Sequence, residues 1–341
     1  MNTMPNPSWN LAIATLILLT GSCDTMSKND TKFEWKATES APKLYPMEII
    51  KGTFIYHGEA EQGLYVPSGG TLKAGWGIPI SSHVVGDRLK PLPDRLKITF
   101  FSYAEKQFYQ GEFNLPYEKI LALFREGVAA NREEPTYSGI MVGIAPGGAV
   151  AVWVEGTENV EVFFGQAQKV DLDPSSAFAL PFKNKQEADA YIAKQLVNAL
   201  TPDELASLKK DGIPFGLWER YRNRYDWRPI SSDGKNLIGV NVVFLNGESI
   251  RDWVLDDKKQ PHLPRPVPMK VSFETLVNGE EVIFMVNFDE FETMAAFEKL
   301  GANGQKVTLE FEPRLPRTQI KVRLRNDKES IELKKINSED W

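Results

Sequence analysis

The sequence predicts an α+β protein in which two related β-rich domains, each an antiparallel sheet carrying one helix, are joined by a helical connector. Three observations predict this architecture. Strand-like runs rich in β-branched and aromatic residues dominate the chain from Tyr45 onward. Helical periodicity with start and stop signals occupies the middle. The order of elements in the first β region then recurs in the second, as in a duplicated domain.

These observations divide the 341 residues into five segments. A chain of this length fits about two domains. The predicted segments are a signal peptide (1–22), a lipidated cysteine with a polar tether (23–45), a first α+β domain (46–175), a helical connector (176–230) and a second α+β domain (231–341).

The first domain is predicted to contain one helix and several strands. Pro116–Val128 carries apolar residues at helical spacing, and Pro116 suits a first turn. Pro146-Gly147-Gly148 has the composition of a tight turn between two strands. The predicted strands are Met47–His57, Arg95–Ser102, Gln107–Phe113, Gly139–Ile144, Ala149–Glu155 and Val160–Gly165.

The connector is predicted to be helical. Asn184 and Thr201 each precede a glutamate by three residues, which is the pattern of a capping box. Gly212 marks the end of the second of these helices. Phe215–Tyr225 is predicted to add a third short helix.

The second domain repeats the β pattern. Asn278-Gly279 is the strongest two-residue signal for a hairpin. A helix is predicted over Asp289–Leu300 because Asp289 can cap it and Gly301 can end it. The predicted strands are Leu237–Leu245, Met269–Leu276, Glu281–Asn287, Val307–Glu312, Gln319–Leu324 and Ser330–Lys334.

The two β regions share an order of strand, proline-rich loop, hairpin, helix and hairpin. The first loop ends in PLPDRLKITFFS and the second in LPRPVPMKVSFET. This order favours a duplication. The alternative is chance similarity, because units of a hairpin and a helix are common.

The N-terminus predicts export and a lipid anchor. Leu11–Thr20 is an uncharged apolar run that suits the core of a signal peptide and is too short to span a bilayer. Gly21 and Ser22 then precede Cys23, the only cysteine of the chain, in an order that resembles the bacterial lipobox. We therefore expect cleavage before Cys23 and attachment to a membrane of the envelope, facing the periplasm, through lipid on that residue.

Two departures leave an alternative open. Thr20 occupies the position where the lipobox usually has leucine, and the first ten residues lack Lys and Arg. The segment could instead be a plain secretory signal with an incidental cysteine, or a buried apolar strand. Asp24, which follows the cysteine, resembles the signal that retains lipoproteins at the inner membrane of enteric bacteria.

Composition excludes several classes of function. The net charge of −6 and the pI of about 5.4 give no basic surface for nucleic acid. One cysteine excludes an internal disulfide and a zinc site of several thiolates. His57, His83 and His262 do not share the spacing of metal ligands, and no nucleotide-binding glycine motif occurs, so neither a metal nor a cofactor is expected.

Two long loops are the expected contact regions for a protein partner. Val66–Pro93 and Arg251–Pro268 occupy equivalent points of the proposed repeat, and loops of such length are usually functional or mobile. Trp76 and Trp253 are the candidate anchors, one in each loop. His83 and Arg88 are further candidate contacts in the first loop.

The segment Gly216–Pro229 interleaves aromatic residues with arginines. Its rings would share one helical face, which favours burial as an anchor between domains. The alternative is a binding surface, because Trp, Tyr and Arg are enriched in interface hot spots. Arg220 and Arg224 are the candidate contacts in that alternative.

Longer phrases carry a family resemblance. LYVPSGGTLKAGWGIPISSHVVGD, GIMVGIAPGGAVAVWV and GIPFGLWERYRNRYDWRP resemble the bacterial proteins grouped as domain of unknown function 2931, over roughly residues 33–335. Members of that family are often labelled lipoproteins. The resemblance supplies no catalytic residues, and it implies an association with type VI secretion and lipase-like effectors, as expected of immunity proteins.

The expected function is therefore binding rather than catalysis. The chain is interpreted as a membrane-anchored periplasmic lipoprotein that holds a protein partner, such as a secreted phospholipase effector. One alternative is a cell-envelope hydrolase using Ser68, His83 and Asp87, although a polar loop whose side chains bond its own backbone also explains these residues. Another is a structural envelope lipoprotein without a toxin partner.

Overall fold

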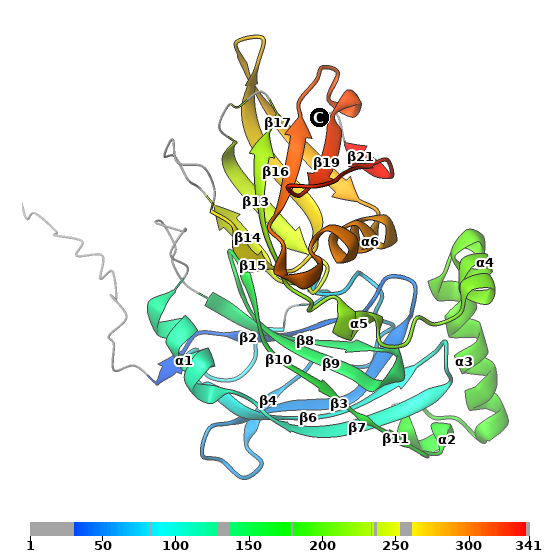
Figure 1. Cartoon of the computed structure of the whole chain (residues 1–341). Coiled ribbons are helices and arrows are strands. Elements are labelled where there is room, and N and C mark those ends of the chain that lie inside the picture. The colour runs from blue at the N-terminus through cyan, green and yellow to red at the C-terminus, as the bar shows by residue number, and fades with distance from the viewer. Residues whose placement is uncertain are drawn as a thin grey trace, which may run out of the picture.

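β-Strands dominate the computed structural model, which describes residues 31–81, 83–127, 137–178, 180–232, 234, 237–252 and 261–338. In this part of the chain the strands form a nine-stranded sheet, two five-stranded sheets and one two-stranded sheet. Figure 1 shows them as two layered lobes, with α3 (Lys185–Ala199) and α4 (Pro202–Asp211) at the side of the first lobe. The expected combination of strands and helices is confirmed.

The first lobe packs two layers of strands face to face. One layer has the order β11-β7-β6-β3-β4, and the other contributes β2-β8-β9-β10 to the nine-stranded sheet. The strands are β1 (Lys32–Phe33), β2 (Lys36–Ser40), β3 (Met47–Tyr56), β4 (Gly63–Tyr65), β5 (Lys90–Pro91), β6 (Pro93–Ser102), β7 (Gln107–Asn114), β8 (Tyr137–Ala145), β9 (Ala149–Gly156), β10 (Asn159–Gln166) and β11 (Gln168–Val170).

The second lobe is also layered. One layer contributes β14-β13-β16-β17-β21 to the nine-stranded sheet, and the other has the order β15-β12-β18-β19-β20. The strands are β12 (Tyr225–Ser231), β13 (Ile238–Phe244), β14 (Ser249–Asp252), β15 (Leu263–Arg265), β16 (Pro268–Val277), β17 (Glu280–Phe288), β18 (Val307–Glu312), β19 (Lys321–Arg325), β20 (Ser330–Leu333) and β21 (Ile336–Ser338).

The two lobes have the same strand order and connections. β4-β3-β6-β7 in one corresponds to β14-β13-β16-β17 in the other, and a helix follows β7 and β17 alike. The β3–β6 and β13–β16 pairs each shift register near the end of the first strand. One aromatic contact also recurs, because the indole N–H of Trp35 donates to the carbonyl of Pro91 (3.1 Å) and that of Trp227 to the carbonyl of Pro266 (3.0 Å).

Two features differ from the expected antiparallel sheets. β2 pairs with β8 and β12 pairs with β18 in parallel, because the chain crosses through a whole sheet and a helix before it returns. The lobes also share a sheet, since Asn159 of β10 pairs with Ser249 of β14. The sequence pattern did not predict either feature.

The helices follow their sequence signals, except for the short helix Pro174–Ala177, which was not predicted. They are α1 (Tyr117–Glu126), α2 (Pro174–Ala177), α3 (Lys185–Ala199), α4 (Pro202–Asp211), α5 (Leu217–Arg220) and α6 (Glu290–Leu300). The predicted capping box at Thr201 is present, and the Asn184 and Asp289 side chains each accept a backbone N–H of their helix.

The third connector helix is shorter than predicted. α5 ends at Arg220, and Tyr225 begins strand β12, so Tyr225 does not lie on a helical face with Trp218. The polypeptide needs an extended segment at this point to run beside β18. Other turns match their signals: Asn278 and Gly279 both have positive φ, as a type I′ hairpin requires.

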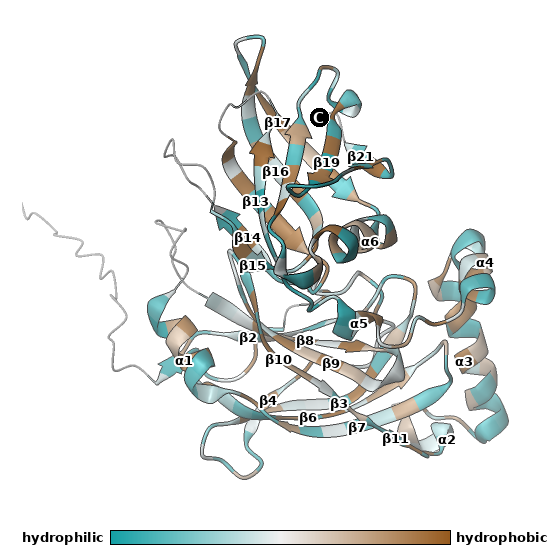
Figure 2. Ribbon diagram, in the orientation of Figure 1, coloured by the Kyte–Doolittle hydropathy of each residue, from teal (hydrophilic) through white to brown (hydrophobic). Residues whose placement is uncertain are grey.

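The hydrophobic core continues between the lobes. One buried cluster joins Trp76, Met141 and Trp153 of the first lobe to Val242 and Phe273 of the second. Figure 2 shows hydrophobic residues along the strands of both lobes and hydrophilic ones over α4. The indole N–H of Trp153 donates to the carbonyl of Asn246 at 3.1 Å, which ties the lobes together at this point.

Candidate interaction surface

The loop between β4 and β6 is held along the edge of the first lobe. Isolated bridges join Met47 to Leu72, Ala41 to Gly75 and Ala37 to His83. The amide N–H of Ile80 also donates to the carbonyl of Glu39 at 3.0 Å. These contacts fix the loop backbone against β2 and β3, so its side chains occupy defined positions.

Large apolar side chains of this loop, and of Tyr65 at the end of β4, face solvent. They are between 38% and 86% exposed, which is unusual for such residues when they lie close together in sequence. We call them the apolar loop surface: Tyr65, Ile78, Ile80, Val84 and Leu89. Exposed apolar groups on a fixed backbone are typical of protein-binding sites.

His83 and Arg88, the candidate contacts of this loop, are both exposed. The Nδ1 atom of exposed His83 lies 3.4 Å from the hydroxyl of Tyr65. Arg88 is exposed and pairs with Glu34, with Nε 2.7 Å from the carboxylate. Both side chains could therefore contact a partner that covers the apolar loop surface.

A buried carboxyl group lies beneath the loop. Glu39 is only 2% exposed, and burial raises the pKa of its carboxyl group above the ordinary value. Neighbouring Ser81 and His83 lower that pKa in part. Protonation of Glu39 thus depends on how closely the loop packs over it.

The proposed hydrolase residues do not form a triad in this structure. Among the described residues, no hydrogen bond joins Ser68, His83 and Asp87, and the neighbour of His83 Nδ1 is Tyr65. The backbone carbonyl of Asp87 accepts from the Lys90 ammonium at 2.7 Å. The geometry therefore offers no support for nucleophilic catalysis by these three residues.

Trp76 is not an exposed anchor, contrary to the sequence-based expectation. Its ring is 7% exposed and packs 5.1 Å from the ring of Trp153 and 6.4 Å from that of Trp218. The large apolar ring is removed from water by packing between the lobes rather than by a partner. Trp253, the second candidate anchor, lies outside the described residues.

The arginines of the connector contact the protein itself. Arg220 pairs with Glu298 at 2.8 Å, and Arg224 pairs with Glu248 at 2.5 Å. Arg222 pairs with buried Glu161 at 2.6 Å. These pairs favour the interpretation of the segment as an anchor between lobes. Contact of Arg220 and Arg224 with a partner stays a prediction.

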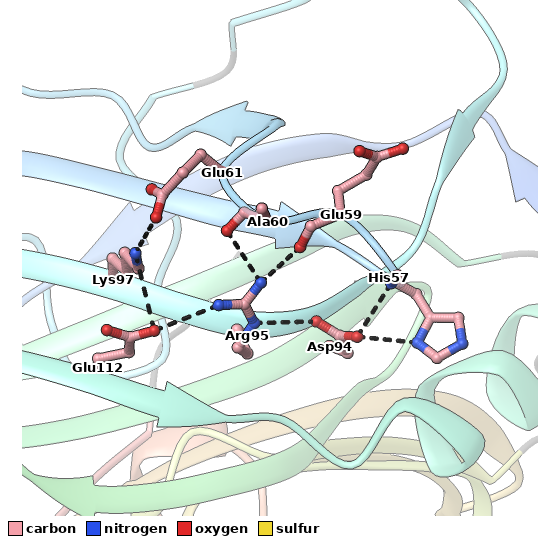
Figure 3. Close-up of polar contacts among 9 residues, drawn as sticks. His57, Glu59, Ala60, Glu61, Asp94, Arg95, Lys97 and Glu112 are labelled. Atoms are coloured by element: carbon pink, nitrogen blue, oxygen red, sulfur yellow. Dashed lines mark hydrogen bonds and ion pairs between the residues drawn. The ribbon is translucent and has the colours of Figure 1, made fainter.

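A polar cluster that the sequence analysis missed lies at the β3–β4 turn. His57 Nδ1 lies 2.9 Å from the carboxylate of Asp94, and the imidazole stacks on Tyr117 at 3.7 Å. Figure 3 shows Arg95 at the centre of the cluster, where its guanidinium contacts the carbonyls of the turn and two carboxylates. The remaining members are Glu59, Ala60, Glu61, Lys97 and Glu112.

This cluster fixes the turn at the end of the sheet. Its charged groups bond one another and the turn backbone, and its residues come from the β3–β4 turn, β6 and β7. His57 and Asp94 are 37 positions apart in the sequence, so no short-range residue spacing indicates their contact. No sequence pattern therefore indicated this cluster.

The family comparison shows to which protein family the chain belongs. A family model described as "Protein of unknown function (DUF2931)" matches residues 22–216, more than half of the chain. The chain belongs to this family. The match to DUF2931 ends at residue 216, next to the start of α5. The sequence phrases predicted a resemblance that continues to roughly residue 335. Neither the curated proteins nor the solved structures searched contain a match to this DUF2931 protein.

Two further observations concern the described part of this DUF2931 protein. No helix there is both long and apolar enough to cross a membrane. No group of three or more His, Cys, Asp or Glu side chains in the same ranges is placed to hold a metal ion. Cys23, the predicted lipidation site, lies outside the described residues.

Proposed function

We propose that this DUF2931 protein is an exported, lipid-anchored binding protein that holds a protein partner at the apolar loop surface. The observation that carries the proposal is the set of exposed apolar side chains on a backbone fixed by three bridges. A fixed loop loses little conformational entropy when a partner binds, so more of the contact free energy appears as affinity. The partner we propose is a secreted lipase-like effector, in keeping with the family resemblance.

We also propose that the two lobes are copies of one ancestral domain. The shared strand order, the matching register shifts and the repeated Trp-to-Pro hydrogen bond support this interpretation. In a duplicated protein the loops Val66–Pro93 and Arg251–Pro268 occupy equivalent places. A partner could therefore contact both lobes, although the shared core favours one rigid binding platform over a moving clamp.

The lipid anchor has a direct test. Cys23→Ser is expected to abolish incorporation of labelled fatty acid, and to release the protein into the soluble periplasmic fraction or leave it unprocessed, because the serine hydroxyl does not replace the thiol in lipoprotein processing. The measurement is membrane fractionation beside metabolic labelling of wild type. A Cys23→Ser protein that still fractionates with membranes would contradict the anchor.

The apolar loop surface can be tested by introducing charge. Val84→Asp and Leu89→Asp should each weaken capture of the partner by about tenfold or more, because a carboxylate would lose water on entering an apolar contact. The fold should tolerate both changes, since the two side chains are exposed. The measurement is the affinity of the purified chain for a secreted lipase-like protein.

Val197→Asp on α3 is the matched control, because Val197 is also an exposed valine but lies away from the loop in sequence. It should leave the affinity unchanged. Equal binding by Val84→Asp, Leu89→Asp and the control would remove the apolar loop surface from the proposal. No binding by wild type would reject the proposed effector.

A further inference from the structure

We infer that a pocket between the β8–β9 turn and the start of α5 binds one branched aliphatic side chain of a protein partner. The pocket has a volume of ≈ 100 Å³, and its walls include Pro146, Phe164, Phe215 and Trp218. This site lies outside the apolar loop surface and adds a second, chemically defined contact. The inference rests on the proposed function only in that the ligand is a protein.

Two conspicuous phrases of the sequence meet at this pocket. Pro146 and Gly147 of the β8–β9 turn line one side, and Phe215, Gly216 and Trp218 line the other. Gly147 and Gly216 have φ values of 78° and 79°, which suit glycine. A Cβ atom added at Gly147 would lie 3.0 Å from the ring of Phe215, so a side chain there would crowd the opposite wall.

The Gly147 wall is held in place by hydrogen bonds. The Gly147 amide donates to the Glu105 carboxylate at 3.0 Å, and the other oxygen of Glu105 accepts from the Tyr109 hydroxyl at 2.7 Å. The Gln166 side-chain amide donates to the Gly147 carbonyl. The pocket wall is therefore formed before a ligand arrives, which lowers the entropic cost of binding.

The indole of Trp218 supports the pocket from within the protein. It is 2% exposed and packs against Trp76, which packs in turn against Trp153. Tyr45 meets the same indole edge to face, with ring centroids 5.7 Å apart. Trp76 thus acts as a positioning residue for this pocket. The sequence analysis had instead proposed that Trp76 contacts the partner directly.

The size of the pocket selects the kind of ligand. Sites for cofactors and drug-sized molecules usually enclose about 300–1,000 Å³. A cavity of about 150 Å³ holds a benzene ring, so the smaller pocket here suits the side chain of leucine or isoleucine. The apolar rings of Phe164, Phe215 and Trp218 match such a side chain.

The rim adds a preference for charge. Glu219 lines the pocket and is exposed, and no ion pair to its carboxylate is present among the described residues. Phe215, which also lines the pocket, is 63% exposed and can cover an entering side chain. We therefore expect the partner to present leucine or isoleucine next to lysine or arginine.

The test uses a displayed random-peptide library selected on the full chain. Selected peptides should carry leucine or isoleucine beside a basic residue. Calorimetric titration of one such synthetic peptide should show binding at least tenfold weaker to Phe215→Ala, which loses a pocket wall, and several-fold weaker to Glu219→Lys. Phe291→Ala is the matched control, because Phe291 is 60% exposed on α6, and it should bind as wild type does.

Two outcomes would contradict binding at this pocket. One is that no peptide with this pattern is selected, and the other is that the selected peptide binds wild type and Phe215→Ala with equal affinity. Thermal unfolding of the same variants confirms that each is folded during titration. The proposed function is judged separately by effector capture. A chain that binds these peptides at Phe215 yet captures no effector would support the pocket and contradict the effector.

Discussion

Trp153→Ala is expected to lower the free energy of unfolding by about 3–5 kcal/mol, as full truncation of a buried tryptophan does. The side chain is completely buried, packs on Trp76, and donates to the carbonyl of Asn246 in the second lobe. Its neighbourhood leaves little room for collapse, because Gly77 and Gly247 bring their backbones together beside it. The substitution should therefore leave a cavity and an unpaired carbonyl between the lobes.

Chemical denaturation followed by circular dichroism measures this effect. Because one core cluster joins the lobes, wild type should unfold in a single transition. Phe291→Ala, which truncates an exposed ring, should change the free energy of unfolding by about 1 kcal/mol or less. A Trp153→Ala protein as stable as Phe291→Ala would show that the contact between lobes contributes little.

Trp35→Ala and Trp227→Ala should each cost about 3–5 kcal/mol and should differ by no more than about 1 kcal/mol. Both rings are buried, and each indole N–H donates to a proline carbonyl that precedes β6 or β16 by two residues. If the lobes are copies of one domain, each tryptophan closes the same corner of its lobe. The loss of packing and of the hydrogen bond should then be alike.

The same denaturation measurement compares the two variants. Tyr65→Ala, an exposed aromatic residue of the first lobe, is the control and should have a much smaller effect. One strongly destabilised variant beside one of near wild-type stability would contradict equivalent roles for Trp35 and Trp227. That result would weaken the proposal of a duplication, because the two tryptophans would then contribute differently to stability although the lobes share a topology.

Local features of the fold could be predicted from the sequence. The predicted strand Gln107–Phe113 is β7 (Gln107–Asn114), and the predicted helix Pro116–Val128 contains α1 (Tyr117–Glu126). Such elements depend on periodicity, capping and turn residues within a few positions of one another. Glycine and proline signals likewise located Gly212 and Asn278-Gly279.

Contacts between distant segments could not be predicted in this way. Nothing local to Trp76 reveals that Trp153 and Trp218 bury its ring, and nothing near Asn159 indicates its pairing with Ser249. The strand pattern of β2 does not distinguish a parallel from an antiparallel neighbour. For the candidate site, the sequence proposed the loop with His83 and Arg88, whose role in binding stays a prediction. It also proposed Trp76 as an exposed anchor, and this residue is buried.

Hydrogen–deuterium exchange of the full chain, alone and with a secreted lipase-like protein as the proposed partner, tests the proposed binding surface most directly. Backbone amides become protected where a partner excludes water or stabilises local structure. The proposal predicts new protection in peptides covering residues 78–89, and its loss in Val84→Asp but not in Val197→Asp. Unchanged exchange in residues 78–89, with protection confined to other segments, would contradict the apolar loop surface as the binding site.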